Sequence, residues 1–250
     1  MTWDFTLIFI ALGAAVPLLG RRRIHQLMKS PRTTKPERYR LYASTAASQW
    51  IAAAFVFWRA HVHGIGSAQL GLSISKPVLA IIVSIVLTAF IIANQVFALR
   101  KLGEHPEEVR GVLPQLAMRI FPQDNAERVA FSGVVVTVAL CEEFIFRGFV
   151  QGVFQDWSHG SVFVGVIGSS ALFAWAHLYQ GRRGLISTFI AGLIFSTMRA
   201  ITLSLLPSSL AHFGADLVVG FLAPSRFRVA FASLAACKSR GTNPPSLAEL

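Results

Sequence analysis

The chain has 250 residues, of which 54% are hydrophobic and 14% charged, and its mean hydropathy is +0.56. This composition is too apolar for an ordinary soluble domain and suits a single membrane domain of about six to eight helices. The net charge of +11 lies between hydrophobic runs, and no basic patch interleaved with aromatic residues is present, so nucleic-acid binding is not expected.

Seven apolar segments are predicted to cross a membrane as helices. The first does not follow a signal-peptide pattern, because its basic cluster comes after the apolar run, so we expect a retained transmembrane helix. The predicted fold class is therefore all-α, a polytopic membrane helix bundle of about seven (six to eight) transmembrane helices. The second and seventh segments are short and could be tilted or irregular helices that line a cavity. The segments are 3–20, 43–58, 77–99, 129–150, 161–179, 185–204 and 208–223.

Lys and Arg residues alternate between rich and poor connections along the chain. The connection 21–40 carries eight of them, 100–128 carries five, 180–184 carries two, and the tail from residue 225 carries four. The intervening connections carry two, none and none. Because positive charge marks the cytoplasmic side, we predict a multi-pass protein of the cell membrane with its N-terminus outside and its C-terminus in the cytoplasm. The mixed-charge connection 100–128 could hold a short interfacial helix, although a solvated loop that sets the topology is the simpler expectation.

Three ionisable side chains, Glu142, Glu143 and Arg147, lie inside one strongly apolar segment. A charge at bilayer depth costs at least ~2.5–3.5 kcal/mol, so such residues usually face a protein interior or a wet cavity. Glu143 and Arg147 are four residues apart, which predicts an ion pair on one helix face. Glu142 is rotated by about 100° from Glu143 and needs a partner from another helix. The preceding Cys141 is expected to be a small packing residue, because Cys237 is the only other cysteine and forms no metal motif with it.

Two later apolar segments each carry a histidine four residues from a second side chain: Phe173 pairs with His177, and His212 pairs with Asp216. His177 and His212 are the candidate partners of Glu142, and Asp216 can hydrogen-bond the His212 imidazole and fix its orientation. A single buried histidine is more often a packing residue than a catalyst. The joint occurrence of these pairs with the two glutamates is hard to explain as packing, so we expect all these side chains to converge from three helices.

Such a set of side chains can activate water. A buried glutamate can act as general base, one histidine can share the proton and pass it to a leaving amine, and a second histidine can stabilise an oxyanion. The same set could bind a divalent metal such as zinc through Glu142, His177 and His212, with water in the fourth position. The residues leave both versions open.

At these residues the chain resembles the CPBP family of CAAX proteases and bacteriocin-processing enzymes, also called the Abi family or type II CAAX prenyl endopeptidase-like membrane proteases. That family is marked by EExxxR, FxxxH and HxxxN or HxxxD, in this order on successive helices. Each motif alone is weak, but three in order within membrane segments are specific. Here they read Glu142-Glu143-Phe-Ile-Phe-Arg147, Phe173-Ala-Trp-Ala-His177 and His212-Phe-Gly-Ala-Asp216.

The resemblance implies an all-helical intramembrane endopeptidase. It implies that Glu142 activates water together with His177, and that Glu143 and Arg147 form a supporting pair. It further implies that the third motif stabilises the oxyanion of the tetrahedral intermediate. The family often has Asn where this chain has Asp216, and an ionised carboxylate cannot donate a hydrogen bond to an oxyanion. A second role for Asp216 is therefore to orient the histidine of its own motif.

The resemblance divides the chain into N-terminal membrane helices with basic loops (1–124), a CPBP-like catalytic membrane core (125–225) and a cytoplasmic tail (226–250). Family members process prenylated C-termini, bacteriocin leader peptides or membrane-anchored regulators, and some are adaptors. The expected partners are therefore the lipid bilayer and a membrane-associated protein or peptide substrate. The alternatives are a non-catalytic membrane adaptor of the same family and a proton-coupled transporter. The short chain and the lack of a visible inverted repeat argue against the transporter.

Overall fold

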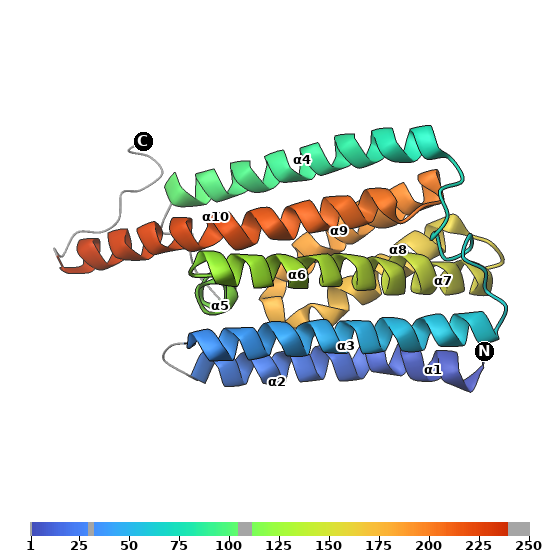
Figure 1. The fold of residues 1–250 in the computed structure, drawn as a ribbon, viewed down its shortest axis with the longest axis horizontal. Coiled ribbons are helices and arrows are strands. Elements are labelled where there is room, and N and C mark those ends of the chain that lie inside the picture. Colours follow the sequence, from blue (N-terminus) through green and yellow to red (C-terminus); the bar gives the residue numbers. More distant parts are fainter. Residues whose placement is uncertain (1, 30–32, 105–111, 240–250) are drawn as a thin grey trace.

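The computed structural model describes residues 2–29, 33–104 and 112–239, and every regular element in this part of the chain is a helix (Figure 1). The predicted all-α helix bundle is confirmed. Two of the elements, η1 and η3, are short π-helical segments that continue directly into α-helices, and η4 is a 3-10 turn. The elements are α1 (Trp3–Ile10), η1 (Ala11–Ala15), α2 (Val16–Lys29), α3 (Lys35–Val62), α4 (Pro77–Glu104), α5 (Val112–Ile120), α6 (Asn125–Glu142), η3 (Glu143–Val150), α7 (Gln151–Trp157), α8 (Val162–Ala176), η4 (Leu178–Gln180), α9 (Gly181–Thr202) and α10 (Leu206–Ser239).

Within the described residues, five helical stretches are long and apolar enough to cross a membrane, and the chain is an integral membrane protein. The predicted fifth span corresponds to α8, which is apolar but only 15 residues long. The predicted second span lies in α3, which has 28 residues but is rich in Ala, Ser and Thr and is not among the five. These two spans therefore stay predictions. The five stretches are Trp3–Lys29, Pro77–Lys101, Asn125–Trp157, Leu178–Thr202 and Leu206–Phe227.

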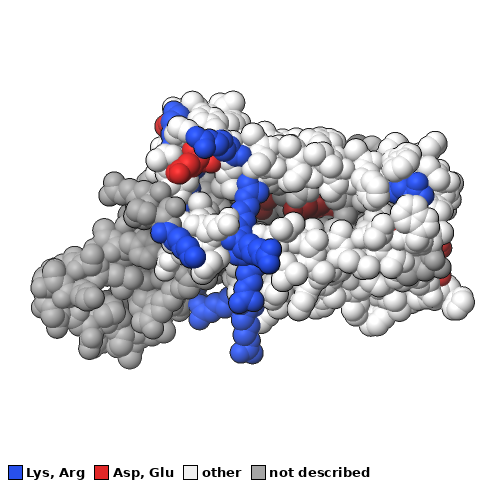
Figure 2. Space-filling model, turned by 90° about the horizontal axis from the view of Figure 1, so that it is seen from below, with Lys and Arg blue, Asp and Glu red and all other residues white. Residues whose placement is uncertain are grey.

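The helices run along one common axis (Figure 1). The end of α2, the start of α3, the short α5 and the C-terminal end of α10 lie at one end, and the start of α1 lies at the other. Figure 2 shows Lys and Arg side chains forming a band across the molecule, next to a broad surface with few charges. This arrangement agrees with the predicted charge alternation, while the side of the membrane that each end faces stays a prediction. The short helix that 100–128 could hold is α5, and α10 continues to Ser239, past the predicted end of the seventh span.

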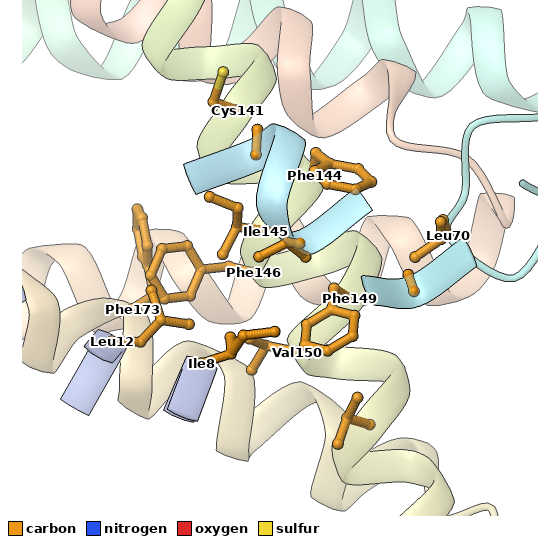
Figure 3. Packing of buried hydrophobic residues seen from close by; sticks show 14 of the residues in the cluster. Ile8, Leu12, Leu70, Cys141, Phe144, Ile145, Phe146, Phe149, Val150 and Phe173 are labelled. Carbon is orange, nitrogen blue, oxygen red and sulfur yellow. The ribbon is translucent and has the colours of Figure 1, made fainter. Parts of the chain in front are cut away.

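The most deeply buried element is η3, in which all eight residues are buried. It lies at the centre of the bundle, so apolar side chains from other elements cover it on several sides. Gly148 allows the α3–α4 connection to approach it, because a Cβ at this position would lie 2.8 Å from the backbone oxygen of Leu70. Figure 3 shows the apolar neighbours of η3, among them Ile8 and Leu12 of the first helical stretch, Leu70, and Phe173 of α8.

Two buried ion-pair clusters hold α3 against its neighbours. Arg38 of α3 donates two hydrogen bonds to Glu127 of α6, at 3.1 and 2.7 Å. Near the other end of α3, the fully buried Asp4 of α1 lies 2.7 Å from Arg59 Nη2 and 2.7 Å from His63 Nε2. Removing one partner of a buried pair is strongly destabilising, so these clusters fix the position of the whole helix. The middle of α3 is thereby held beside the start of η3.

Candidate active site

Glu142 and Glu143 lie at the junction where α6 ends and η3 begins. Glu143 and Arg147 are both fully buried, and Arg147 Nη1 donates to Glu143 Oε1 at 3.0 Å. The ion pair predicted from the four-residue spacing is therefore present. The Arg147 guanidinium carbon also lies 4.0 Å from the centre of the Phe173 ring, which gives the cation a second favourable contact at bilayer depth.

His212 of α10 faces the same carboxylate. Its Nδ1 lies 3.0 Å from Glu143 Oε1, and its Nε2 lies 3.6 Å from Asp216 Oδ2. The predicted approach of His212 and Asp216 is present, but the distance is longer than a direct hydrogen bond. The ring stacks on Phe195 at a centroid distance of 5.7 Å. Glu143 thus joins two helices, because one of its oxygens contacts both Arg147 of η3 and His212 of α10.

Glu142 points to a different set of partners. Its Oε2 lies 3.9 Å from His177 Nε2 and accepts no hydrogen bond from the described protein. His177 follows the last residue of α8, and its Nδ1 lies 2.8 Å from the Phe173 backbone oxygen. A carbonyl oxygen only accepts, so Nδ1 carries the proton, and in the neutral ring Nε2 presents a lone pair toward Glu142. Two acceptors that face each other at this distance can share one water molecule.

The other oxygen of Glu142 has a partner from α3 that the sequence did not point to. Gln49 Nε2 donates to Glu142 Oε1 at 2.8 Å. A signal was present, because Gln49 is an amide in the middle of an uncharged apolar segment. Nothing in the sequence indicated which helix its side chain would face. The structure therefore places the six predicted residues in two groups and adds Gln49 to the first. The first group is Glu142 with His177, and the second is Glu143 with Arg147, His212 and Asp216. His212, expected as a partner of Glu142, contacts Glu143 instead.

The predicted metal ligands do not form a compact set. No group of three or more His, Cys, Asp or Glu side chains within the described residues is arranged to hold a metal ion. Of the predicted set, His177 faces Glu142, whereas His212 directs Nδ1 to Glu143 and Nε2 toward Asp216. The donor geometry does not fit a metal bound by Glu142, His177 and His212, so we derive no step through one.

An apolar cavity of about 560 Å³ is lined in part by the residues next in the sequence to Glu142 and Gln49. Its walls come from α3, the α3–α4 connection, the end of α6 and the start of α10. Cys141, a buried free cysteine expected to pack, is part of this wall, and Trp50 follows Gln49 in it. Neither Glu142 nor Gln49 is among the residues that line this cavity. Figure 2 shows acidic side chains inside a hollow of the surface, beside the band of Lys and Arg.

Residues 125–218 match a known family, the type II CAAX prenyl endopeptidase Rce1-like proteins. The matched segment is less than half of the chain, but it runs from the start of α6 into α10 and contains every residue of the three motifs. Gln49 and the rest of α3 lie outside it. No curated protein and no solved structure matched the chain.

Proposed function

We propose that the chain is an intramembrane protease of the type II CAAX prenyl endopeptidase Rce1-like family, which its residues 125–218 match, and that it hydrolyses a peptide bond with water activated by Glu142. The observation that carries this proposal is the 3.9 Å separation between Glu142 Oε2 and His177 Nε2. Both atoms are hydrogen-bond acceptors when the histidine is neutral, and a water between them can donate to each.

A water between Glu142 and His177 can attack a peptide bond that is bound next to it. Glu142 takes a proton from the water while the water oxygen attacks the carbonyl carbon of the scissile bond. The C–N bond of the tetrahedral intermediate then breaks, and the proton passes through Glu142 or His177 to the leaving amine. The products are one new carboxylate and one new amine. His177 can accept and return this proton because its Nδ1 is held by the Phe173 carbonyl and its Nε2 faces the reaction.

We assign oxyanion stabilisation to His212. Its Nδ1 is engaged by Glu143, while its Nε2 is 3.6 Å from Asp216, too far for a strong hydrogen bond. An Nε2 proton is therefore free to shift toward an oxyanion that forms nearby. Asp216 then orients the His212 ring, a role that an ionised carboxylate can perform. Arg147 holds Glu143 in place for this contact.

The substrate we propose is a membrane-associated protein or peptide, with prenylated C-termini and leader peptides as the two classes of candidate. The apolar cavity lined by Cys141 and Trp50, the sequence neighbours of Glu142 and Gln49, supports a substrate with an apolar segment or group. A divalent metal such as zinc was the other version that the sequence left open, and a chelator tests it directly.

The test is cleavage of a library of membrane-tethered peptides by the purified protein in detergent, with and without chelator. We expect new amino termini, identified by mass spectrometry, and cleavage that continues in chelator. Peptide binding without cleavage would support the adaptor instead. Proton-coupled uptake in vesicles without cleavage would support the transporter.

A further inference from the structure

Gln49 lies near the middle of α3, outside the segment that matches the protease family. The stretch 43–58 around it contains no charged residue, and its side chain is partly buried. Its amide nitrogen donates to Glu142 Oε1 at 2.8 Å. A hydrogen bond to an ionised carboxylate is shorter and stronger than one between neutral groups, so this contact restrains the carboxylate as well as the amide.

We infer that Gln49 is a positioning residue of the proposed reaction, which holds the Glu142 carboxylate so that Oε2 faces His177. This inference rests on the proposed function of Glu142. A carboxylate attached through a flexible side chain can rotate about its last bond and exchange its two oxygens. The Gln49 amide removes this freedom, because it binds Oε1 from one side while His177 approaches Oε2 from the other.

No other side chain in the described residues donates a hydrogen bond that would orient the Glu142 carboxylate. Arg147, the cation nearest in sequence, donates to Glu143 and not to Glu142. His212 also contacts Glu143. His177 lies 3.9 Å from Glu142, beyond direct hydrogen-bond distance. Within the described residues, Gln49 is therefore the one side chain that makes a hydrogen bond to Glu142.

The helix that carries Gln49 is held in place by buried ion pairs. The buried pairs Arg38–Glu127 and Asp4–Arg59 fix the helix on both sides of Gln49. The amide is therefore presented from a rigid element, which is what precise orientation of a reactive group requires. The simpler interpretation is that Glu142 merely satisfies an amide that would otherwise be buried without a partner. That interpretation predicts an effect of Gln49 on stability and none on the chemical step.

Two variants separate the interpretations. Gln49→Met keeps the length of the side chain and removes the donor, and Gln49→Glu keeps its shape and replaces the donor with an acceptor. We expect kcat to fall by about 10-fold or more in both, with KM within about twofold of the parent, because the lost contact acts on the base and not on substrate binding. Ser48→Ala is the matched control, since Ser48 is exposed on the same helix and bonds only to the Thr45 carbonyl.

The measurements are kcat, KM and the midpoint of thermal unfolding in detergent, with Glu142→Gln assayed in parallel. A lowered kcat with an unchanged unfolding midpoint supports the inference. An unchanged kcat, a loss confined to KM, or a lower unfolding midpoint with full activity per folded molecule would overturn it. Activity in Glu142→Gln would overturn the proposed function itself. Normal kcat in Gln49→Met beside an inactive Glu142→Gln would overturn only the role of Gln49.

Discussion

Neighbouring glutamates in this chain have different surroundings because their side chains leave the helix in different directions. Glu143 is fully buried and contacts Arg147 and His212, so its charge is balanced inside the bundle. Glu142 has a neutral amide on one oxygen and a histidine ring at 3.9 Å from the other. A general base needs an oxygen that is free to bind water. In the described part of the chain each glutamate has one oxygen without a hydrogen-bond partner, but the free oxygen of Glu142 faces His177 Nε2, a second proton acceptor.

The buried pair gives the first prediction. Glu143→Gln leaves Arg147 charged and without a carboxylate at bilayer depth, which we expect to destabilise the fold by about 3–5 kcal/mol. Thermal unfolding in detergent and the yield of folded protein measure this loss. Glu142→Gln is the control, because it leaves the Glu143–Arg147 pair intact and should unfold near the parent temperature. Equal unfolding midpoints for the two variants would contradict the assignment.

Asp216 gives the second prediction. The side-chain oxygen of asparagine can accept a hydrogen bond from the Nε2–H of His212, and its NH2 group is a donor, so we expect Asp216→Asn to keep substantial activity. Asp216→Ala and His212→Ala should lose most of it. Cleavage by the three variants is measured from pH 5 to 9. An asparagine variant as inactive as the alanine variant at every pH would show that negative charge is required at this position.

The sequence predicted the short-range pairs in this site and one long-range approach, that of His177 to Glu142, but not the other long-range contacts. The Glu143–Arg147 pair and the approach of His212 to Asp216 follow from four-residue spacing on a helix. The contact between His212 and Glu143 spans 69 residues and depends on how α10 packs against η3. The Gln49 contact depends in the same way on the packing of α3.

Among the elements, η3 belongs both to the buried core and to the candidate active site. Its residues Glu143–Val150 read in the sequence as the continuation of an ordinary helix, and nothing in them predicted a π-helix. Such segments occur often at functional sites, and this one carries Glu143 and Arg147. It begins directly after Glu142, so the two glutamates lie on either side of a change in helix geometry.

The close approach at η3 gives the third prediction. Gly148→Ala would place a Cβ 2.8 Å from the Leu70 backbone oxygen, and backbone cannot move aside as a flexible side chain can. We expect a loss of about 1–3 kcal/mol in stability, together with reduced cleavage. Gly152→Ala is the matched control one turn further on, because an added Cβ there has no neighbour within 4 Å. Thermal unfolding of both variants is the measurement, and an equal effect would contradict the packing argument.

Across the whole molecule, composition and charge alternation predicted the fold class and the arrangement of connections. Apolar runs of about 20 residues are a strong signal, because the bilayer sets their length. The signal is weaker for α8, which has 15 residues, and for α3, whose buried ion pairs lie near its two ends. Those contacts with other helices are not visible in the composition of α3 alone.

Sidedness gives the fourth prediction. A reporter fused after Gly20 and another in the tail beyond residue 225 should both report the cytoplasm, because Lys and Arg are concentrated in these connections. A reporter inserted between Trp157 and Gly160, in a connection without Lys or Arg, should report the opposite side. A cytoplasmic signal from that third reporter would contradict the seven-span arrangement.

The central claim is that Glu142 activates the water that cleaves the substrate. Glu142→Gln keeps the size of the side chain and can still contact Gln49, but it cannot take a proton from water. The measurement is the rate of cleavage of one membrane-tethered peptide by parent and variant, at equal amounts of folded protein and in the same detergent. We predict a loss of at least ~10²-fold with an unchanged unfolding midpoint. A cleavage rate in Glu142→Gln near that of the parent would show that another group activates the water.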